Sequence, residues 1–292
     1  MKNQNVLAWF LLLLLAVIWG SSPILIKKAL IQLDPFEIGA LRLSLASVVL
    51  MPFLYKNLKE IRRGDYFILF VSGVVGSVIP YFLYPIAQTR IDSATSGVLT
   101  SLTPFFALII GVIFYKLKAT KNNIFGLVFG FSGTSILILF SSSTDGFKAD
   151  LFGLFVVAAT LLYGINLNLV KYHLSHLKPI TITSFSIVSI LPITLYILFV
   201  NTEFLSHLEN ISQFKSEFTY VFILGVLGTS IATLIFYNLI KIKDTVFASM
   251  VTYLMPIVAI AFGVLDGEKI NLTQLLGMLL ILLGVYVNGR KN

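Results

Sequence analysis

Long uncharged runs of apolar residues, separated by short polar stretches, dominate this chain. Eight runs lie near the ~20 residues that an α-helix needs to cross a bilayer. They are residues 6–26, 66–89, 93–115, 151–170, 179–202, 218–240, 245–265 and 270–289. Two further runs are less regular, since 38–55 contains Arg42, and 125–140 is short but extends through Asn122 and a Ser/Thr stretch to Thr144. Barrel strands would alternate in segments of ~10 residues, so the pattern predicts an all-α polytopic membrane protein with ten transmembrane helices.

The composition agrees with a membrane protein and excludes several soluble classes. Hydrophobic residues make up 57% and charged residues 12% of the chain, against roughly 25% charged in soluble domains. The mean hydropathy is +0.94. Cysteine is absent, which removes disulfide frameworks and thiolate metal sites, and there is no P-loop of an ATP-driven pump. We therefore expect no catalytic residue, no metal site and no cofactor.

The positions of the basic residues predict the orientation. Of 21 Lys and Arg residues, 14 fall in the termini and the loops on the N-terminal side, 6 fall in the opposite loops, and Arg42 lies within a helix. Because Lys and Arg accumulate in cytoplasmic loops, both termini are expected in the cytoplasm. The protein is then expected in the plasma membrane, which is the inner membrane in a bacterium. The net charge of +8 has this origin and indicates no nucleic-acid partner.

The second half of the chain repeats the first. A shift of 152 residues aligns 66–112 with 218–264 without a gap, and twelve of the 47 aligned positions are identical. A shift of 144 residues aligns the first two helical runs with those near 151 and 179. Identical pairs that composition alone does not explain are Gly20/Gly164, Pro35/Pro179, Gly73/Gly225, Gly76/Gly228, Asp92/Asp244, Pro104/Pro256 and Gly111/Gly263. The pairs indicate an internal duplication.

Each repeat contains five helices, residues 6–144 in the first and 151–289 in the second. An odd number of crossings makes the second repeat start from the opposite membrane face, which gives two inverted five-helix repeats. Secondary transporters are often built in this way, with substrate held near the midplane and access alternating as one repeat rocks on the other. The alternative is a duplication that produced a structural membrane protein; the pattern favours transport.

Several motifs resemble the EamA-like branch of the drug/metabolite transporter superfamily. They are Ala16–Ser22 (AVIWGSS) in the first helix, Arg42 in the second, Ser249–Pro256 (SMVTYLMP) in the ninth, Gly267-Glu268, and Gln274–Gly277 (QLLG) in the tenth. The resemblance covers nearly the whole chain, as two EamA-like units. It implies a transporter, in most cases an exporter, of amino acids, other small metabolites or toxic compounds. The implied partners are a small-molecule substrate and the lipid bilayer, and a coupling ion is left open.

The resemblance also implies a central cavity lined by helices 1, 3, 4, 6, 8 and 9. One departure is visible, because the glutamate expected after the fourth helix aligns with Lys116, whereas the second repeat keeps Glu268. This departure weakens any role that the family assigns to the position in the first repeat.

Uncharged polar and aromatic residues at membrane depth are concentrated on those helices. The candidate substrate-binding residues are Trp19, Ser22, Tyr81, Tyr84, Thr100, Tyr163, Asn166, Thr233, Tyr237, Thr252 and Tyr253. Buried polar groups need partners, which a hydrated cavity supplies, but Ser, Thr and Asn also join neighbouring helices. For a single residue the second role is favoured, and for the whole set a wet cavity.

Pro104 and Pro256 lie midway along repeat-related helices. Proline lacks an N–H group, so the carbonyls of Thr100 and Thr252 lose their helical partners. In lipid such a carbonyl needs a neighbouring helix, water or a ligand. We expect the two prolines to be hinges beside the cavity; the alternative is a packing kink in which threonine hydroxyls satisfy the carbonyls.

Charge within the predicted helices is scarce, which limits the mechanism. We expect Arg42 to have a structural role and to extend outward toward Asp34 or Glu37. Lys27 and Lys171 are expected to anchor at the membrane interfaces. Since no Asp or Glu lies in the middle of a helix, an acidic-site multidrug/proton antiporter is disfavoured. Two other functions remain open, a lipid or glycolipid flippase and a membrane-embedded enzyme acting on lipid-linked substrates.

Overall fold

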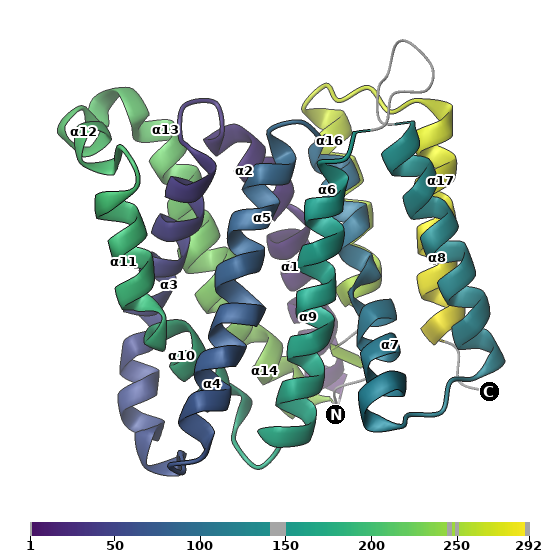
Figure 1. Ribbon diagram of the computed structural model, residues 1–292, viewed down its shortest axis with the longest axis horizontal. Helices are drawn as coiled ribbons and strands as arrows, with labels where there is room; N and C mark the ends of the chain where they lie inside the picture. The colour runs from purple at the N-terminus through teal and green to yellow at the C-terminus, as the bar shows by residue number, and fades with distance from the viewer. Residues whose placement is uncertain (1, 141–149, 244–246, 249–250, 290–292) are drawn as a thin grey trace.

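The computed structural model describes residues 2–140, 150–243, 247–248 and 251–289. In this part of the chain, eight helices are long and apolar enough to cross a membrane, and two shorter apolar helices, Leu254–Leu265 and Leu272–Val287, complete the ten expected spans. The all-helical fold that the apolar runs predicted is confirmed. Figure 1 shows the spans running roughly parallel, with both chain ends on the same side.

The first repeat contains five spans. In chain order they are α1 (Lys2–Gly20) with α2 (Ser22–Ala29), α3 (Pro35–Asn57), α4 (Asp65–Gly73) with the π-helix η2 (Val74–Val78) and α5 (Ile79–Gln88), α6 (Ser93–Leu99) with the 3₁₀ turn η3 (Thr100–Leu102) and α7 (Thr103–Tyr115), and α8 (Lys121–Leu139). The fifth span begins before Asn122 as expected. Its proposed extension to Thr144 lies outside the described residues, and so does the boundary between the repeats at 144.

The second repeat follows the same plan. Its spans are α9 (Gly153–His173), α10 (Pro179–Ser189) with α11 (Leu191–Val200), α13 (Ile211–Phe222) with the π-helix η4 (Ile223–Ile231) and α14 (Ala232–Ile242), α16 (Val251–Leu265), and α17 (Leu272–Gly289). Because five spans precede it, α9 starts on the face opposite to α1, which is visible in Figure 1. Between the spans, η1 (Leu58–Glu60) and α12 (Phe204–Glu209) are short connecting helices.

Repeat-related residues start and bend these helices for the same physical reasons. Pro35 and Pro179 stand in the first turn of α3 and α10, where the missing N–H would be unpaired in any case. Both third spans of the repeats contain a π-helix, η2 and η4, at matching positions. Such segments are rare in α-helices and occur frequently at functional sites.

Glycines let the two repeats approach each other closely. A Cβ atom added at Gly133 would lie 2.5 Å from the carbonyl oxygen of Gly277, and one at Gly284 would lie 2.7 Å from that of Gly126. The backbones of α8 and α17 therefore pack directly against each other, side by side at one end of the molecule (Figure 1). Gly126 and Gly130, four residues apart on α8, accordingly serve the close packing of this helix against α17.

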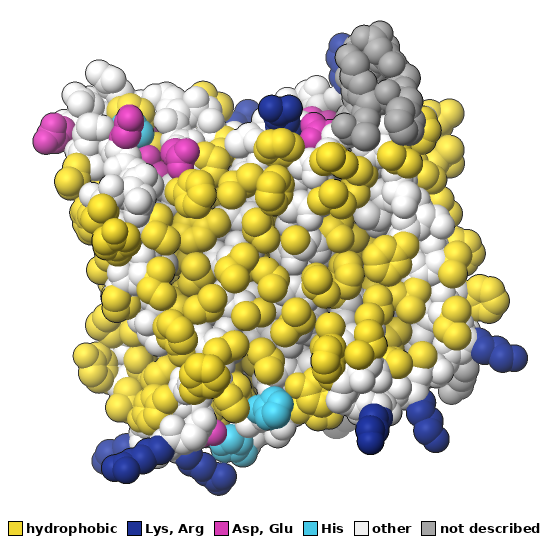
Figure 2. Space-filling model, in the orientation of Figure 1, with side chains coloured by type: hydrophobic (Ala, Val, Ile, Leu, Met, Phe, Trp, Pro, Cys, Tyr) yellow, Lys and Arg dark blue, Asp and Glu magenta, His cyan; other side chains and the backbone are white. Residues whose placement is uncertain are grey.

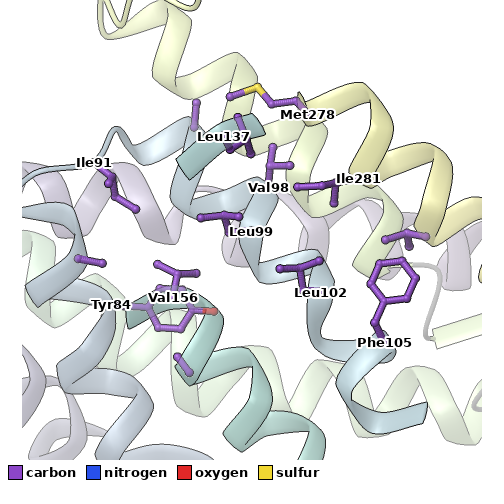
Figure 3. Close-up of a cluster of buried hydrophobic side chains, with 14 of the residues drawn as sticks. Tyr84, Ile91, Val98, Leu99, Leu102, Phe105, Leu137, Val156, Met278 and Ile281 are labelled. Carbon is purple, nitrogen blue, oxygen red and sulfur yellow. The ribbon is translucent and has the colours of Figure 1, made fainter. Parts of the chain in front are cut away.

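The largest buried cluster joins both repeats near the fourth span. Leu99, Leu102 and Phe105 are fully buried there, against Leu137 of α8 and Ile281 of α17 (Figure 3). In lipid such packing is driven by van der Waals contact rather than by escape from water. The cluster fixes α6, η3 and α7 against their neighbours.

The outer surface matches a bilayer. Figure 2 shows a broad hydrophobic band, with most of the visible Lys, Arg and His on the lower face and most of the visible Asp and Glu on the upper face. Large apolar side chains such as Phe67, Ile113 and Leu265 are exposed in the band. The two ends of the spans in this view are called the lower end and the upper end.

Candidate functional site

A cavity of about 380 Å³ lies between the two repeats. It is lined by Trp19, Gly20, Ser22, Pro23, Ile26, Arg42, Tyr81, Tyr84, Gly97, Thr100, Ser101, Thr103, Pro104, Tyr163, Asn166, Leu167, Gly228, Thr233, Phe236, Thr252, Met255, Pro256 and Ala259. These residues come from the first, third, fourth, sixth, eighth and ninth spans, as the resemblance implied, together with Arg42 of the second.

The structure brings together most of the residues that the sequence singled out. Nine of them line the cavity, namely Trp19, Ser22, Tyr81, Tyr84, Thr100, Tyr163, Asn166, Thr233 and Thr252. Both candidate hinges, Pro104 and Pro256, line it as well. The side chains of Tyr237 and Tyr253 lie outside what the structure describes. The role of the set in binding a substrate remains a prediction.

Aromatic side chains form two walls of the cavity. On one side, Trp19 Nε1 donates to the carbonyl oxygen of Gly228 at 3.0 Å, and its ring lies 5.6 Å from that of Phe236. On the other side, Tyr84 stacks with Tyr163 at 6.2 Å between ring centroids. The Tyr84 hydroxyl donates to Thr100 Oγ1 at 3.0 Å, so the tyrosine is held in place and presents a ring face to the space.

The fourth span bends at Pro104 without leaving a bare carbonyl. The Thr100 carbonyl, which Pro104 deprives of its α-helical donor, accepts from the Thr103 backbone N–H and from Thr103 Oγ1 at 2.9 Å. The expected need for a ligand or a neighbouring helix is therefore wrong in the first repeat, because a 3₁₀ turn and one hydroxyl satisfy the carbonyl. In the second repeat, Pro256 lies inside the continuous α16.

Arg42 corrects another expectation. Instead of extending outward to Asp34 or Glu37, it turns into the cavity and is only 8% exposed. Its Nε donates to Thr229 Oγ1 at 3.1 Å, and its guanidinium lies 4.1 Å from the centroid of the Tyr81 ring. The inward direction follows from the π-helix η4, which presents the Thr229 hydroxyl at this depth. Periodicity with an α-helical repeat cannot reveal such a partner.

Some of the polar residues hold helices together. Asn168 Nδ2 donates to the carbonyls of Ala107 and Gly164, each at 2.9 Å. Ser230 Oγ donates to the Ala46 carbonyl at 3.3 Å. The bonds to Ala107 and Ala46 join neighbouring spans, which is the role that the sequence favoured for any single Ser, Thr or Asn.

Above the cavity, an ionic cluster closes the upper end of the first, fourth and tenth spans. Lys27 Nζ lies 2.7 Å from Glu268 Oε1 and 3.4 Å from Asp266 Oδ2, and Lys28 pairs with Asp266. Glu268 also accepts from Ser93 N at 2.9 Å. We call Lys27, Lys28, Asp266 and Glu268 the upper latch. Lys27, expected as an anchor at the membrane interface, thus pairs with two carboxylates of the loop before the tenth span.

The electrostatics of the upper latch favour an ionised Glu268. Burial alone would raise the pKa of this carboxyl, but hydrogen bonds from Lys27, Ser93 and Ala94 outweigh it and lower the pKa. By contrast, burial and the nearby charge of Glu268 raise the pKa of Asp92. Glu268 is thus held as a carboxylate by the donors around it.

The counterpart of Glu268 in the first repeat is Leu117 rather than Lys116. Lys116 has the left-handed φ of 56° that Gly267 adopts with 87°. The next residue then folds back, so that Leu117 N donates to Gly111 O at 3.1 Å and Glu268 N donates to Gly263 O at 3.0 Å. The gapless alignment placed Lys116 there because the one-residue slip between the repeats begins just before it.

An inverted pair of five-span repeats around a shared polar and aromatic cavity defines a helical membrane transporter. The model of the EamA-like transporter family matches residues 6–139 and 151–290. The chain therefore belongs to the EamA-like transporter family, as its motifs suggested, and is a multi-pass membrane protein of two EamA units.

Relatives of known sequence or structure agree with this assignment. An uncharacterized transporter of Archaeoglobus fulgidus is 25% identical over 285 residues, 97% of this chain and 99% of the relative. A protein of Chlamydia trachomatis named as an S-adenosylmethionine/S-adenosylhomocysteine transporter is 28% identical over 171 residues, 56% of this chain and 52% of that protein. A solved crystal structure shares the fold, with a TM-score of 0.59 and 16% identity over 96% of this chain and 95% of the other.

Proposed function

We propose that this protein is a secondary transporter that exports small metabolites, such as amino acids, by alternating access. The observation that carries the proposal is the cavity of about 380 Å³, whose walls come from both repeats. Its volume lies in the range of pockets that hold small ligands, roughly 300 to 1,000 Å³. Its mixture of aromatic faces and hydroxyl groups suits a small amphipathic molecule better than a lipid.

Alternating access requires two ends that close in turn. In this conformation the upper latch ties the first span to the loop before the tenth, above the cavity. We infer that the units 6–144 and 151–289 rock against each other, and that release at the upper end requires the latch to separate. Pro104 and Pro256 lie beside the cavity, where bending of the fourth and ninth spans changes its shape. The nine described candidate residues, with Tyr237 and Tyr253, are proposed to contact the substrate.

The charge distribution supports a cytoplasmic position for the lower end and both termini. The lower face carries most of the Lys and Arg residues that Figure 2 displays, and the upper face carries most of the acidic ones. Under the positive-inside rule, the upper latch then faces the exterior. In a bacterium this places the protein in the inner membrane, and export proceeds from the lower end to the upper end.

One relative narrows the class of metabolite. The Chlamydia trachomatis protein is named for substrates that carry an amino acid group, and the cavity has room for such a group. Amino acids and their conjugates are therefore the first compounds to test. Transport measured with and without a pH gradient tests whether protons are the coupling ion.

The test is transport in proteoliposomes with a panel of labelled amino acids and amino acid conjugates, with and without a pH gradient. We expect at least one compound to accumulate, and Asn166→Ala to reduce its transport because Asn166 lines the cavity. Asn57→Ala is the matched control, since Asn57 lies at the end of α3 away from the cavity. Movement of a lipid analogue without movement of any metabolite would favour the flippase instead.

A further inference from the structure

Within the described part of the chain, Arg42 is a buried cation without an acidic partner. Its side chain is 8% exposed, and among the described residues no carboxylate lies within ion-pair distance of it. An arginine side chain keeps its positive charge throughout the physiological pH range. Buried charges are normally paired, so this one requires a counter-charge that the described part of the protein does not supply.

The contacts of Arg42 leave one face of the guanidinium group available. Nε is engaged by Thr229 Oγ1 at 3.1 Å, and the plane is supported by the Tyr81 ring at 4.1 Å. The two terminal amino groups, Nη1 and Nη2, have no hydrogen-bond partner among the described residues, and the side chain lines the cavity. Paired terminal N–H groups match the two oxygens of a carboxylate in a bidentate geometry.

The other walls of the cavity add no charge. Among the described lining residues Arg42 alone is charged, and the rest are aromatic, aliphatic or neutral polar groups. A single positive charge balances one monoanion, whereas a phosphate dianion would call for further cations. The rings of Trp19, Tyr84, Tyr163 and Phe236 suit an apolar or aromatic body.

From this geometry we propose that Arg42 binds the carboxylate of the transported metabolite, and that the cavity selects monocarboxylates with an apolar or aromatic body. This inference rests on the proposed function, because it makes the same cavity the transport site. It also assigns Thr229 and Tyr81 as positioning residues. They hold the guanidinium group so that its terminal amino groups face the cavity.

Ser22 is a suitable place to measure the effect of this charge. A Cβ atom built at Gly228 would lie 3.6 Å from Ser22 Oγ and 3.9 Å from Arg42 Nη2, so both side chains border the same small volume. Because the chain has no cysteine, Ser22→Cys introduces a single thiol beside the guanidinium group. Ser206→Cys on the exposed surface of α12 is the reference thiol.

The experiment compares two thiol reagents of opposite charge in reconstituted protein. They are the anionic sulfonatoethyl and the cationic trimethylammonium-ethyl methanethiosulfonates. Relative to the reference thiol, we expect the anionic reagent to be favoured at Ser22→Cys by on the order of tenfold, since a charge a few ångströms away acts strongly in a partly dehydrated site. Arg42→Gln should remove the preference, Arg42→Lys should keep it, and Arg90→Gln, an arginine stacked on Phe152 away from the cavity, should leave it unchanged.

A pair of ligands matched in shape tests the carboxylate itself. Benzoate and benzamide have nearly the same shape and differ in charge, so benzoate should slow the modification of Ser22→Cys at about tenfold lower concentration. Equal protection by the two compounds, or a reagent preference equal to that of Ser206→Cys, would overturn the role of Arg42 and leave the cavity as a transport site. Failure of both reagents to react at Ser22→Cys would instead contradict a water-accessible cavity, and with it the proposed function. Arg42→Gln could be lost to misfolding, in which case the Ser22→Cys protein and its Arg42→Lys variant carry the test. A preference for the anionic reagent that both proteins show, and that persists at high ionic strength, assigns the effect to a charge inside the cavity.

Discussion

Lys27 and Glu268 meet at 2.7 Å although 241 residues separate them. The same carboxylate accepts from Ser93 Oγ at 2.7 Å and from Ala94 N at 3.0 Å. One buried side chain therefore joins the end of the first span, the start of the fourth and the loop before the tenth. Under the proposed alternating access, these three elements separate when the cavity opens at the upper end.

Glu268→Gln should weaken this closure. Glutamine keeps the size of the side chain but loses the charge, and hydrogen bonds to a charged group are worth roughly 1.5–3 kcal/mol. A loss of about 1.4 kcal/mol shifts a two-state balance tenfold. We expect faster modification of a cysteine at Ser96, which is fully buried in the upper half of the fourth span.

Asp266→Asn is the control for that experiment, because Asp266 pairs with Lys28 nearer the surface and does not contact the start of the fourth span. It should change the accessibility of Ser96→Cys less than Glu268→Gln does. Equal rates in the parent and in both variants would show that the upper latch does not hold this end closed.

The upper latch should be insensitive to pH until strongly acidic conditions. The ordinary pKa of a glutamate is 4.5, and the pKa of Glu268 is lowered in the closed protein. The stabilisation is then fully present above the ordinary value and is lost as the pH falls through the lowered value. The rate of modification of Ser96→Cys relative to that of the exposed Ser206→Cys, which corrects for the thiolate fraction, should stay constant from neutral pH to about 5. It should rise only below about 4.5, and Glu268→Gln should lose this rise. A rise that begins near pH 6.5 would assign the closure to another group.

Gly228→Ala and its repeat counterpart Gly76→Ala should behave differently. A methyl group at Gly228 meets Ser22 Oγ at 3.6 Å, an ordinary contact, whereas one at Gly76 would lie 2.1 Å from Asn166 Nδ2. Gly228→Ala should therefore fold with unchanged or slightly higher stability, by up to about 1 kcal/mol, but transport several-fold more slowly because it narrows the cavity beside Arg42. Gly76→Ala should displace Asn166 from Ser72, its donor at 2.7 Å, and lower the thermal midpoint. Thermal unfolding and transport measured on both variants check the pair, and the reverse order of stability would contradict it.

Replacing either central proline should alter transport more than folding. Alanine restores an N–H group and permits a straight α-helix, in place of the 3₁₀ turn at Thr100–Leu102 or within α16. Since the repeats are inverted, Pro104→Ala and Pro256→Ala should bias access toward opposite membrane faces. The measurement is labelling of single cysteines at Thr100 and Thr252 from each side, together with transport. Unchanged labelling and transport in well-folded variants would reduce both prolines to packing features.

The orientation predicts which single cysteines are reachable from outside intact cells. Asn57→Cys, at the lower end of α3, should be protected from a membrane-impermeant maleimide, and Ser206→Cys, on α12 at the upper end, should be labelled. Permeabilised cells supply the control, in which both should react. If Asn57→Cys alone were labelled on intact cells, the protein would have the opposite orientation in the membrane.

Length and hydropathy were sufficient to predict the ten spans, because a bilayer imposes one element type and one length on the chain. Paired glycines and prolines predicted the duplication for a similar reason, since each performs a backbone task that leaves little choice of residue. The glycines of α8 and α17 lie at a backbone contact that no larger residue permits. These features depend on local sequence alone.

The direction of long side chains was not predictable in the same way. Asp34 and Glu37 lie at the start of the helix that carries Arg42, but its inward turn depends on Thr229, which lies 187 residues later. The direction of the Lys27 side chain likewise depends on Glu268, which lies 241 residues later. The structural counterpart of Glu268 is Leu117 rather than Lys116 because the two repeats slip by one residue at a left-handed turn. The residue types at this turn do not reveal the slip.

The π-helices η2 and η4 change the direction in which the side chains after them point. A π turn closes its hydrogen bonds at i→i+5 and so holds one residue more than an α turn, which rotates all later side chains by about 100° around the axis. In the third span the rotated residues include Tyr81 and Tyr84, and in the eighth they include Thr233 and Phe236, all of which line the cavity. Deletion of a single residue within either π-helix should therefore rotate the aromatic side chains that follow it away from the cavity, although the sequence still contains them. For this fold, the deletion of one residue within a π-helix is therefore expected to alter the cavity more than most substitutions do.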